Sequence, residues 1–402
     1  MPTNRCEAAS SASQHVTPDT ALAKPADSGR LAVIDEWRGV SVLLVIIHHF
    51  VIFRFLTQFD VDYRLSEFVH HPSIGALKEA GARIFYLWAH GIGPLGVQIF
   101  FVISGFVITR LLIAEKATQG RVCIRCFYIR RIFRIVPALA LFIGFIALID
   151  AAGFISVPRP DFLAASTFLC NTTMVNCGYY FGHLWSLSVE EQFYIIWPCL
   201  FVLLSDRYRT PVILMILAVC MAVALIPTFK IGWLNNGLSF GCIAAGTGYA
   251  ISERARRLFK TINRVPLWLS AATLVIGLPL FGSLAPKWWA VATFITPFTI
   301  VAVVLTRAET FSQQGRSIFA RALREIGLVS YSLYLWHYMF TWEPRTYLSK
   351  TFLFASIPVG IAFAWFSGRY MERVFIRMGR RLALRVSGKS SKPVAAAAAI
   401  SP

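Results

Sequence analysis

The chain has 402 residues, of which 56% are hydrophobic and only 15% are charged, whereas about 25% charged residues is usual for a soluble domain. The 39 Lys and Arg residues outnumber the 20 Asp and Glu residues, for a net charge of +19. This composition excludes a disordered protein and argues against a soluble enzyme. Because the basic residues stand in short segments between apolar runs, it also argues against nucleic-acid binding. We predict an all-α, polytopic membrane helix bundle.

The chain divides into a membrane domain between two tails. Residues 1–30 contain no apolar run and are expected to form a disordered cytoplasmic tail rather than a signal peptide. The membrane domain spans 31–376, and the basic residues 377–402 are expected to be a second disordered cytoplasmic tail. About ten apolar stretches reach the length needed to cross a bilayer; they are 39–56, 94–113, 132–150, 187–205, 211–228, 237–252, 266–283, 288–306, 325–342 and 352–370.

The distribution of positive charge decides whether a weaker apolar stretch, at 161–176, crosses the membrane. If it does not cross the membrane, every strong basic cluster lies on the cytoplasmic side, together with both termini. We therefore predict that 151–186 is an outer loop with a part-buried piece. Cys170 and Cys177 then lie outside, where disulfides persist, and they either form a disulfide or remain two buried thiols.

The first span carries Arg38 at its cytoplasmic end and His49 eleven residues later. Eleven residues turn a helix by about 1100°, so both side chains share one face, roughly 16 Å apart along the axis, whereas His48 points about 80° away. An ionisable side chain deep in a membrane span is energetically costly, so its presence indicates a function. The alternative is a buried histidine that only bonds a neighbouring helix.

The second span contains Ser104 beside Gly105. Small residues allow helix backbones to approach closely, so Gly105 is expected to serve packing, whereas Ser104 is a candidate for lining a ligand channel.

The basic segment that follows includes Arg130, Arg131 and Arg134. Arg130 and Arg134 are four residues apart and would face one way on a helix. Arginine side chains suit phosphate groups, so this segment is either a binding site for a phosphate-bearing cosubstrate or a cluster that only sets membrane orientation.

The fourth span begins with a polar and aromatic segment. Ser188 and Glu191 have the spacing of a capping box, which gives Glu191 a structural explanation that Glu190 lacks. Glu190 stands close to Trp185 and Tyr194. Polar groups among aromatic rings suit a sugar-like acceptor, although an aromatic belt at the membrane interface has the same composition.

The ninth span contains Tyr331, Tyr334 and His337 at intervals of three residues. Residues three apart lie on nearly the same side of a helix. Tyr334 and His337 are therefore candidates for contacts with a substrate.

Together these motifs resemble the acyltransferase-3 family of integral-membrane O-acyltransferases. The match is carried, in family order over about 31–376, by Asp35/Arg38/Gly39, Arg38/His49, Phe100–Phe106, Arg130–Pro137, Trp185–Tyr194 and Ser330–His337. The family often has a Glu-x-Pro turn near its last helix, where this sequence reads Glu372-Arg373-Val374. The chain looks like the stand-alone form, without the extracytoplasmic esterase-like domain of some relatives.

The resemblance implies transfer of an acetyl or short acyl group from acetyl-CoA to a sugar hydroxyl of a surface or secreted glycan or glycolipid, such as O-antigen, exopolysaccharide or nodulation factor. His49 would be the general base, and Glu190 or Glu191 would position the acceptor or carry the proton away. The donor phosphates would meet Arg38, Arg130, Arg131 and Arg134. The substrate would contact Ser104, Trp185, Tyr194, Tyr334 and His337.

We expect a multi-pass protein of the bacterial inner membrane that needs no permanently bound cofactor and no metal. Acyl-CoA, a glycan acceptor and the lipid bilayer are its expected partners. The alternative function is a transporter or flippase for a lipid-linked glycan, because proton-coupled carriers also use intramembrane His and Glu. Carriers often show two related halves, and none is visible in the sequence.

Overall fold

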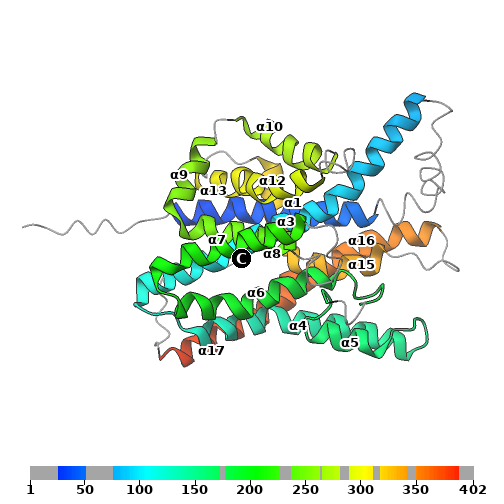
Figure 1. Cartoon of the computed structure of the whole chain (residues 1–402). Helices are drawn as coiled ribbons and strands as arrows, with labels where there is room; N and C mark the ends of the chain where they lie inside the picture. Colours follow the sequence, from blue (N-terminus) through cyan, green and yellow to red (C-terminus); the bar gives the residue numbers. More distant parts are fainter. Residues whose placement is uncertain are drawn as a thin grey trace, which may run out of the picture.

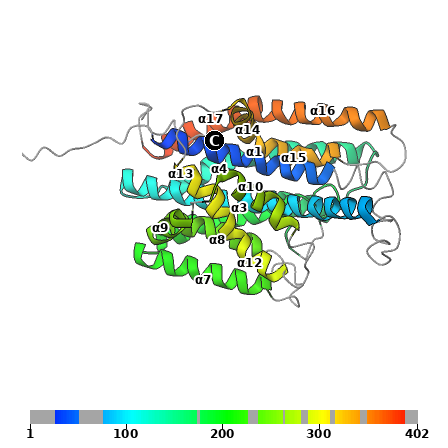
Figure 2. The ribbon, with the colours of Figure 1, turned by 90° about the horizontal axis from the view of Figure 1, so that it is seen from above.

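A computed structural model describes residues 26–50, 76–172, 177–225, 237–262, 265–280, 289–310, 317–341 and 350–388. These residues form helices and connecting turns, with no strand among them, so the all-α prediction is confirmed for this part of the chain. The long helices run roughly side by side (Figures 1 and 2).

The first half of the chain forms α1 (Ala26–Phe50), α3 (Ala76–Gln119), α4 (Ile124–Ala151), α5 (Arg159–Ser166), α6 (Leu184–Leu203) and α7 (Asp206–Leu225). The second half forms α8 (Gly237–Ile251), α9 (Glu253–Ile262), α10 (Leu267–Ala272), α12 (Trp289–Ile300), α13 (Thr306–Thr310), α14 (Ile318–Leu328), α15 (Ser330–Thr341), α16 (Lys350–Phe366) and α17 (Glu372–Val386). Single π-helical turns at Thr273–Gly277, Val301–Leu305 and Ser367–Met371 continue α10, α12 and α16.

Where their residues are described, the predicted apolar spans fall on helices, except for a few residues at span ends and a break at Val329 that divides 325–342 between α14 and α15. Two segments, Gly91–Gln119 of α3 and Ile124–Ala151 of α4, are long and apolar enough by themselves to cross a membrane. Gly237–Ile251, Trp268–Leu280 and Phe294–Ala308 are shorter apolar helices. The two long helices fit a membrane protein, and the count of ten crossings stays a prediction.

Close backbone contact joins α3 to α8. A Cβ atom at Gly105 would collide with the carbonyl of Ile243, and one at Gly246 would collide with the carbonyl of Val102. The two helices therefore meet through a reciprocal pair of glycines, which is how small residues act in membrane helix packing. The packing role predicted for Gly105 is confirmed.

A second reciprocal pair of glycines joins α1 to α14. A Cβ atom at Gly39 would collide with the carbonyl of Leu323, and one at Gly327 with the carbonyl of Asp35. Asp35 and Gly39, on either side of Arg38, both take part in this contact, so the part of α1 that carries Arg38 is packed closely against α14.

The described part of the stretch 161–176, residues 161–172, contains one short helix. Eight residues of α5 measure about 12 Å, far less than the roughly 30 Å of a bilayer core. Beyond α5 the chain turns back onto α6, where the Gln192 amide donates to the Phe168 carbonyl (3.0 Å) and exchanges hydrogen bonds with the Asn171 amide (2.9 and 3.0 Å). The geometry agrees with a part-buried loop rather than a span.

Of the two states left open by the sequence, Cys170 and Cys177 adopt the disulfide, and Cys123 pairs with Cys126 near the start of α4. If the outer placement of 151–186 is correct, an impermeant thiol reagent applied to intact cells will label Cys177 only after reduction, and mass spectrometry of the Cys177 peptide measures this. In a Cys170→Ser variant the Cys177 thiol is expected to react without reduction.

The Cys123–Cys126 pair is the internal control, since the predicted topology places it on the cytoplasmic side. It should react only after the membrane is opened and the sample is reduced. Labelling of Cys177 that likewise requires an opened membrane would show that the predicted topology is wrong from residue 161 onward.

Helix α17 corrects the predicted C-terminal boundary. The tail expected from residue 377 is helical as far as Val386. The reason is packing: a Cβ atom at Gly379 would meet the Phe133 side chain of α4, and Ala383 is buried. Residues 389–402 lie outside the described part of the chain, as does most of the N-terminal tail, although α1 already begins at Ala26.

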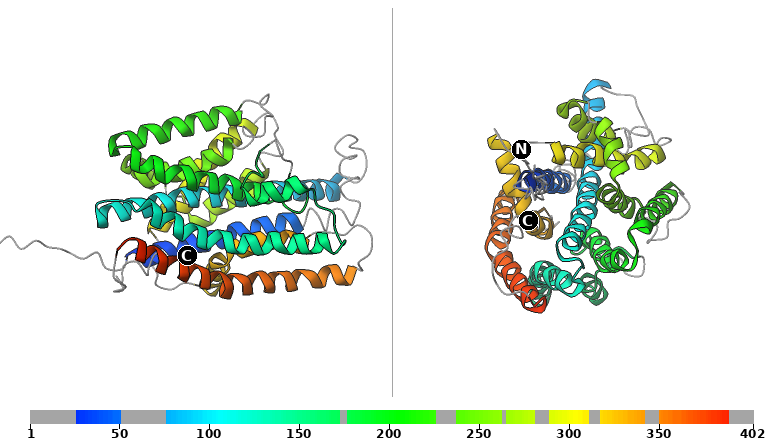
Figure 3. Two further views of the ribbon diagram at one scale, coloured as in Figure 1. Left: turned by 90° about the horizontal axis from the view of Figure 1, so that it is seen from below. Right: turned by 90° about the vertical axis from the view of Figure 1, so that its left-hand side faces the viewer.

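The basic segments gather at one end of the bundle. The connection between α3 and α4, helix α9 and the end of α17 all lie on the left in Figure 1, with α5 at the opposite end. Seen end on in Figure 3, the helices pack around one another in a single bundle. This arrangement fits the predicted sidedness, in which the basic end faces the cytoplasm.

Candidate active site

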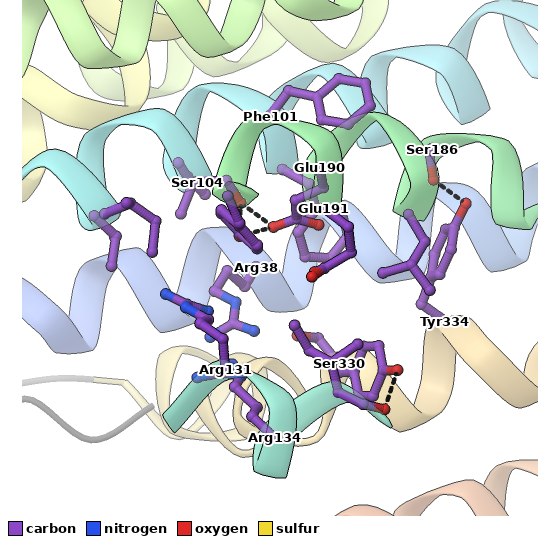
Figure 4. Close-up of a pocket in the computed structure, with 18 of the residues that line it drawn as sticks. Arg38, Phe101, Ser104, Arg131, Arg134, Ser186, Glu190, Glu191, Ser330 and Tyr334 are labelled. Carbon is purple, nitrogen blue, oxygen red and sulfur yellow. Dashed lines mark hydrogen bonds between the residues drawn. The ribbon is translucent and has the colours of Figure 1, made fainter. Parts of the chain in front are cut away.

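A cavity opens between α1, α3, α4, α6 and α15. Its walls include eight of the residues that the sequence singled out, namely Arg38, Ser104, Arg131, Arg134, Glu190, Glu191, Tyr194 and Tyr334. Residues from five helices that are far apart in the sequence thus share one chamber (Figure 4).

Three arginines form the positive wall of the cavity. Arg38 comes from α1 and stands 3.8 Å from the Asp35 carboxylate, while Arg131 and Arg134 come from α4. The Arg131 guanidinium lies over the Tyr194 ring, 4.5 Å from its centroid. In Figure 4 the three side chains gather on one side of the chamber, across from the carboxylates of α6.

Arg130 is placed differently from the prediction. Its guanidinium pairs with Glu115 of α3 at 3.2 Å, its side chain is 41% exposed, and it is absent from the cavity wall. Arg131 takes the position beside Arg134 instead. The reason is that one residue turns a helix by about 100°, so the orientation of α4 decides which of two adjacent arginines faces inward.

Glu190 is the centre of a hydrogen-bond network in the cavity. The hydroxyls of Ser104 and Tyr194 both donate to its Oε1 atom. A carboxylate with two hydroxyl donors is stabilised in place, so Glu190 is held at the junction of α3 and α6. Its carboxylate faces the same space as the arginines.

Glu191 corrects another expectation. Helix α6 begins at Leu184, so Ser188 lies within the helix and donates to the Leu184 carbonyl (2.9 Å) instead of capping the N-terminus. Glu191 is only 8% exposed and lines the cavity beside Glu190. The capping-box interpretation is therefore wrong, and both carboxyl groups face the chamber.

Ser186 and Tyr334 mark one end of the cavity. The Tyr334 hydroxyl donates to the His183 carbonyl (2.7 Å), so the hydrogen bond between Ser186 and Tyr334 (2.5 Å) has Ser186 as its donor. Trp185 does not line the cavity and packs edge-on against Phe101 (6.1 Å between centroids). The sequence did not single out Ser186 as a site residue, because small polar side chains carry little signal.

Beyond this end lies a cluster of histidines. His49 contacts His337 through a nitrogen–nitrogen distance of 3.1 Å, and its ring packs against Tyr338 (5.1 Å between centroids). The His183 ring lies 5.6 Å from that of His337. His48 points elsewhere, with Nδ1 2.7 Å from the Ala89 carbonyl of α3. His49 lies in the last turn of α1, about three turns beyond Arg38, which lies midway along the helix.

No group of three or more potential metal ligands occurs among the described residues. The site therefore consists of arginines, carboxyl groups and hydroxyls in one cavity, with the histidine cluster at its end. This set can bind an anionic ligand at one end and carry out acid–base chemistry at the other.

Comparison with known proteins identifies a matching family and several relatives. A family model described as an acyltransferase domain matches residues 31–369. YrhL of Bacillus subtilis is 28% identical over 285 residues, which cover 62% of this chain and 44% of YrhL. The peptidoglycan O-acetyltransferase OatA of Listeria monocytogenes is 26% identical over 66% of this chain and 49% of its own length. The O-acetyltransferase OatA of Staphylococcus aureus is 27% identical over 69% and 52%.

The chain thus spans about half the length of the relatives that it matches. No solved structure matches it.

Proposed function

Because the chain belongs to the acyltransferase family whose model matches residues 31–369, we propose that it is a membrane O-acetyltransferase that acts on a glycan. The donor is acyl-CoA, bound from the cytoplasmic side, and the acceptor is a sugar hydroxyl of a surface or secreted glycan such as O-antigen, exopolysaccharide or nodulation factor. The observation that carries this proposal is the single cavity in which Arg38, Arg131 and Arg134 face Glu190 and Glu191.

The positive wall suits the donor. Coenzyme A carries several phosphate groups, and guanidinium groups bind phosphates through paired hydrogen bonds. Arg131 and Arg134 lie seven and ten residues from the start of α4, which is roughly 10–15 Å from the basic end of the bundle. Phosphates bound here leave the acyl arm pointing along α1 toward His49.

The histidine cluster beyond the cavity suits the acyl-transfer step. Arg38 and His49 are about 16 Å apart along α1, so an extended acyl arm has room between them. His49 takes the proton from the acceptor hydroxyl, the oxygen attacks the thioester carbonyl, and the carbon–sulfur bond breaks. The proton then returns to the thiolate of coenzyme A. Glu190 and Glu191 either position the acceptor or relay this proton.

The relatives favour a glycan acceptor, since OatA of Listeria monocytogenes is named for peptidoglycan. The test uses the purified chain in lipid nanodiscs with acetyl-CoA and, in separate reactions, peptidoglycan fragments and O-antigen oligosaccharides. We expect acceptor-dependent release of the coenzyme A thiol and an acceptor heavier by one acetyl group. Movement of an unmodified glycan across a proteoliposome membrane, with no thiol release, would instead identify a carrier.

A further inference from the structure

The hydrogen atoms of the histidine cluster can be assigned from its partners. A backbone carbonyl only accepts hydrogen bonds. His337 Nδ1 lies 2.6 Å from the Tyr334 carbonyl, so this nitrogen carries the hydrogen and, in the neutral ring, Nε2 carries the lone pair. His49 Nδ1 lies 2.9 Å from the Val45 carbonyl, so it also carries a hydrogen.

The third contact agrees with both assignments. His49 Nδ1 lies 3.1 Å from His337 Nε2, a nitrogen that carries a lone pair. The one hydrogen on His49 Nδ1 is therefore shared between two acceptors, the Val45 carbonyl at 2.9 Å and His337 Nε2. The His49 lone pair is therefore on Nε2. One directional chain runs from His49 through His337 to the Tyr334 carbonyl, and it leaves His49 in the form that can accept a proton.

The rings of His49 and His337 differ in how deeply they are buried. His337 is only 6% exposed, and the rings of His49, His183 and Tyr334 surround it at 4.9, 5.6 and 5.5 Å between centroids. His49 is less buried than His337. His337 is therefore less accessible to a substrate than His49, which argues against the substrate contact that the sequence suggested for it.

We infer that His337 is a positioning residue that orients His49 and accepts its Nδ1 hydrogen bond, so that His49 Nε2 is the base. This inference rests on the proposed function. When Nε2 takes the proton of the acceptor hydroxyl, a positive charge forms on His49 inside the bundle. The hydrogen bond from Nδ1 to His337 Nε2 then becomes charge-assisted and stronger, so His337 stabilises the transition state through His49, as the third member of a catalytic triad does.

The kinetic test compares two substitutions at one position. His337→Leu removes the acceptor, and we expect kcat to fall about 10- to 100-fold, the usual value of a hydrogen bond to a charged group, with the KM for acetyl-CoA unchanged. His337→Gln places an oxygen near the position of Nε2 and should restore much of the loss. His48→Leu removes a histidine of α1 that bonds the Ala89 carbonyl and not His337, and it serves as the control, with kcat within about threefold of the unsubstituted chain if only the bond to His49 matters.

A merely structural role for His337 would give a different pattern. Its signs are less folded protein on size exclusion for His337→Leu, no restoration by His337→Gln, or an equal loss in His48→Leu. Any of these results overturns the inference while acetyl transfer by the unsubstituted chain still supports the proposed function.

A spectroscopic test does not depend on activity. Nitrogen NMR of the ¹⁵N-histidine-labelled chain in nanodiscs distinguishes protonated from unprotonated ring nitrogens, and a His49→Gln variant identifies the His49 signals. We expect both His49 and His337 to carry hydrogen on Nδ1. Hydrogen on Nε2 of either neutral ring would overturn the inference, even if the chain transfers no acyl group.

Discussion

Replacing His49 by alanine is expected to lower the rate of acyl transfer by about 10²- to 10⁴-fold, the usual contribution of a general base. The donor should still bind, because the arginines of the cavity are untouched, so the Kd for acetyl-CoA changes little. The measurement is thiol release by the purified variant at saturating donor and acceptor. Size exclusion and a thermal melt check that the variant is folded.

His48→Ala is the matched control. It removes a neighbouring ring of the same helix, whose Nδ1 bonds the Ala89 carbonyl and whose ring packs against Gly93. We expect some loss of stability, about 1 kcal/mol for one hydrogen bond, and a much smaller loss of activity. Equal losses in the two variants would mean that the histidines serve packing between α1 and α3 and that neither is the base.

The helices were predictable from the sequence because their signal is local. Apolar runs of sufficient length mark them, and the spans coincide with helices over most of their described residues. The ends of helices were less predictable, because packing decides them. Residues 377–386 are polar enough to suggest a tail, yet Gly379 allows α17 to lie against Phe133 of α4 and the helix continues to Val386.

The site was predictable as a set of residues but not as a geometry. Motif positions indicated Arg38, Arg134 and Glu190, and these do share one cavity. The orientation of each helix about its own axis was beyond the sequence, because it depends on contacts such as the Gly39–Gly327 approach of α1 and α14. The meeting of His49 with His337, 288 residues later, is likewise a property of tertiary packing.

The arginine pair of α4 provides the second strong test, because two similar side chains four residues apart have different surroundings. Arg134 lines the cavity, whereas Arg130 pairs with Glu115 at the surface. Arg134→Ala is expected to raise the KM for acetyl-CoA about 10- to 100-fold, since a hydrogen bond to a charged group contributes about 1.5–3 kcal/mol. Arg134→Lys should recover part of this loss, because an ammonium keeps the charge without the guanidinium fork.

Arg130→Ala should change the same KM less than about fivefold, because exposed ion pairs contribute at most about 1 kcal/mol. Acceptor KM and labelling of Cys177 in intact cells are measured for each variant, so that a change in donor binding is separated from a change in membrane orientation. If Arg130→Ala and Arg134→Ala disturb orientation equally and leave the donor KM unchanged, the cluster only directs insertion. If instead Arg130→Ala has the larger effect on the donor, the phosphates bind outside the cavity, along the face shared by α3 and α4.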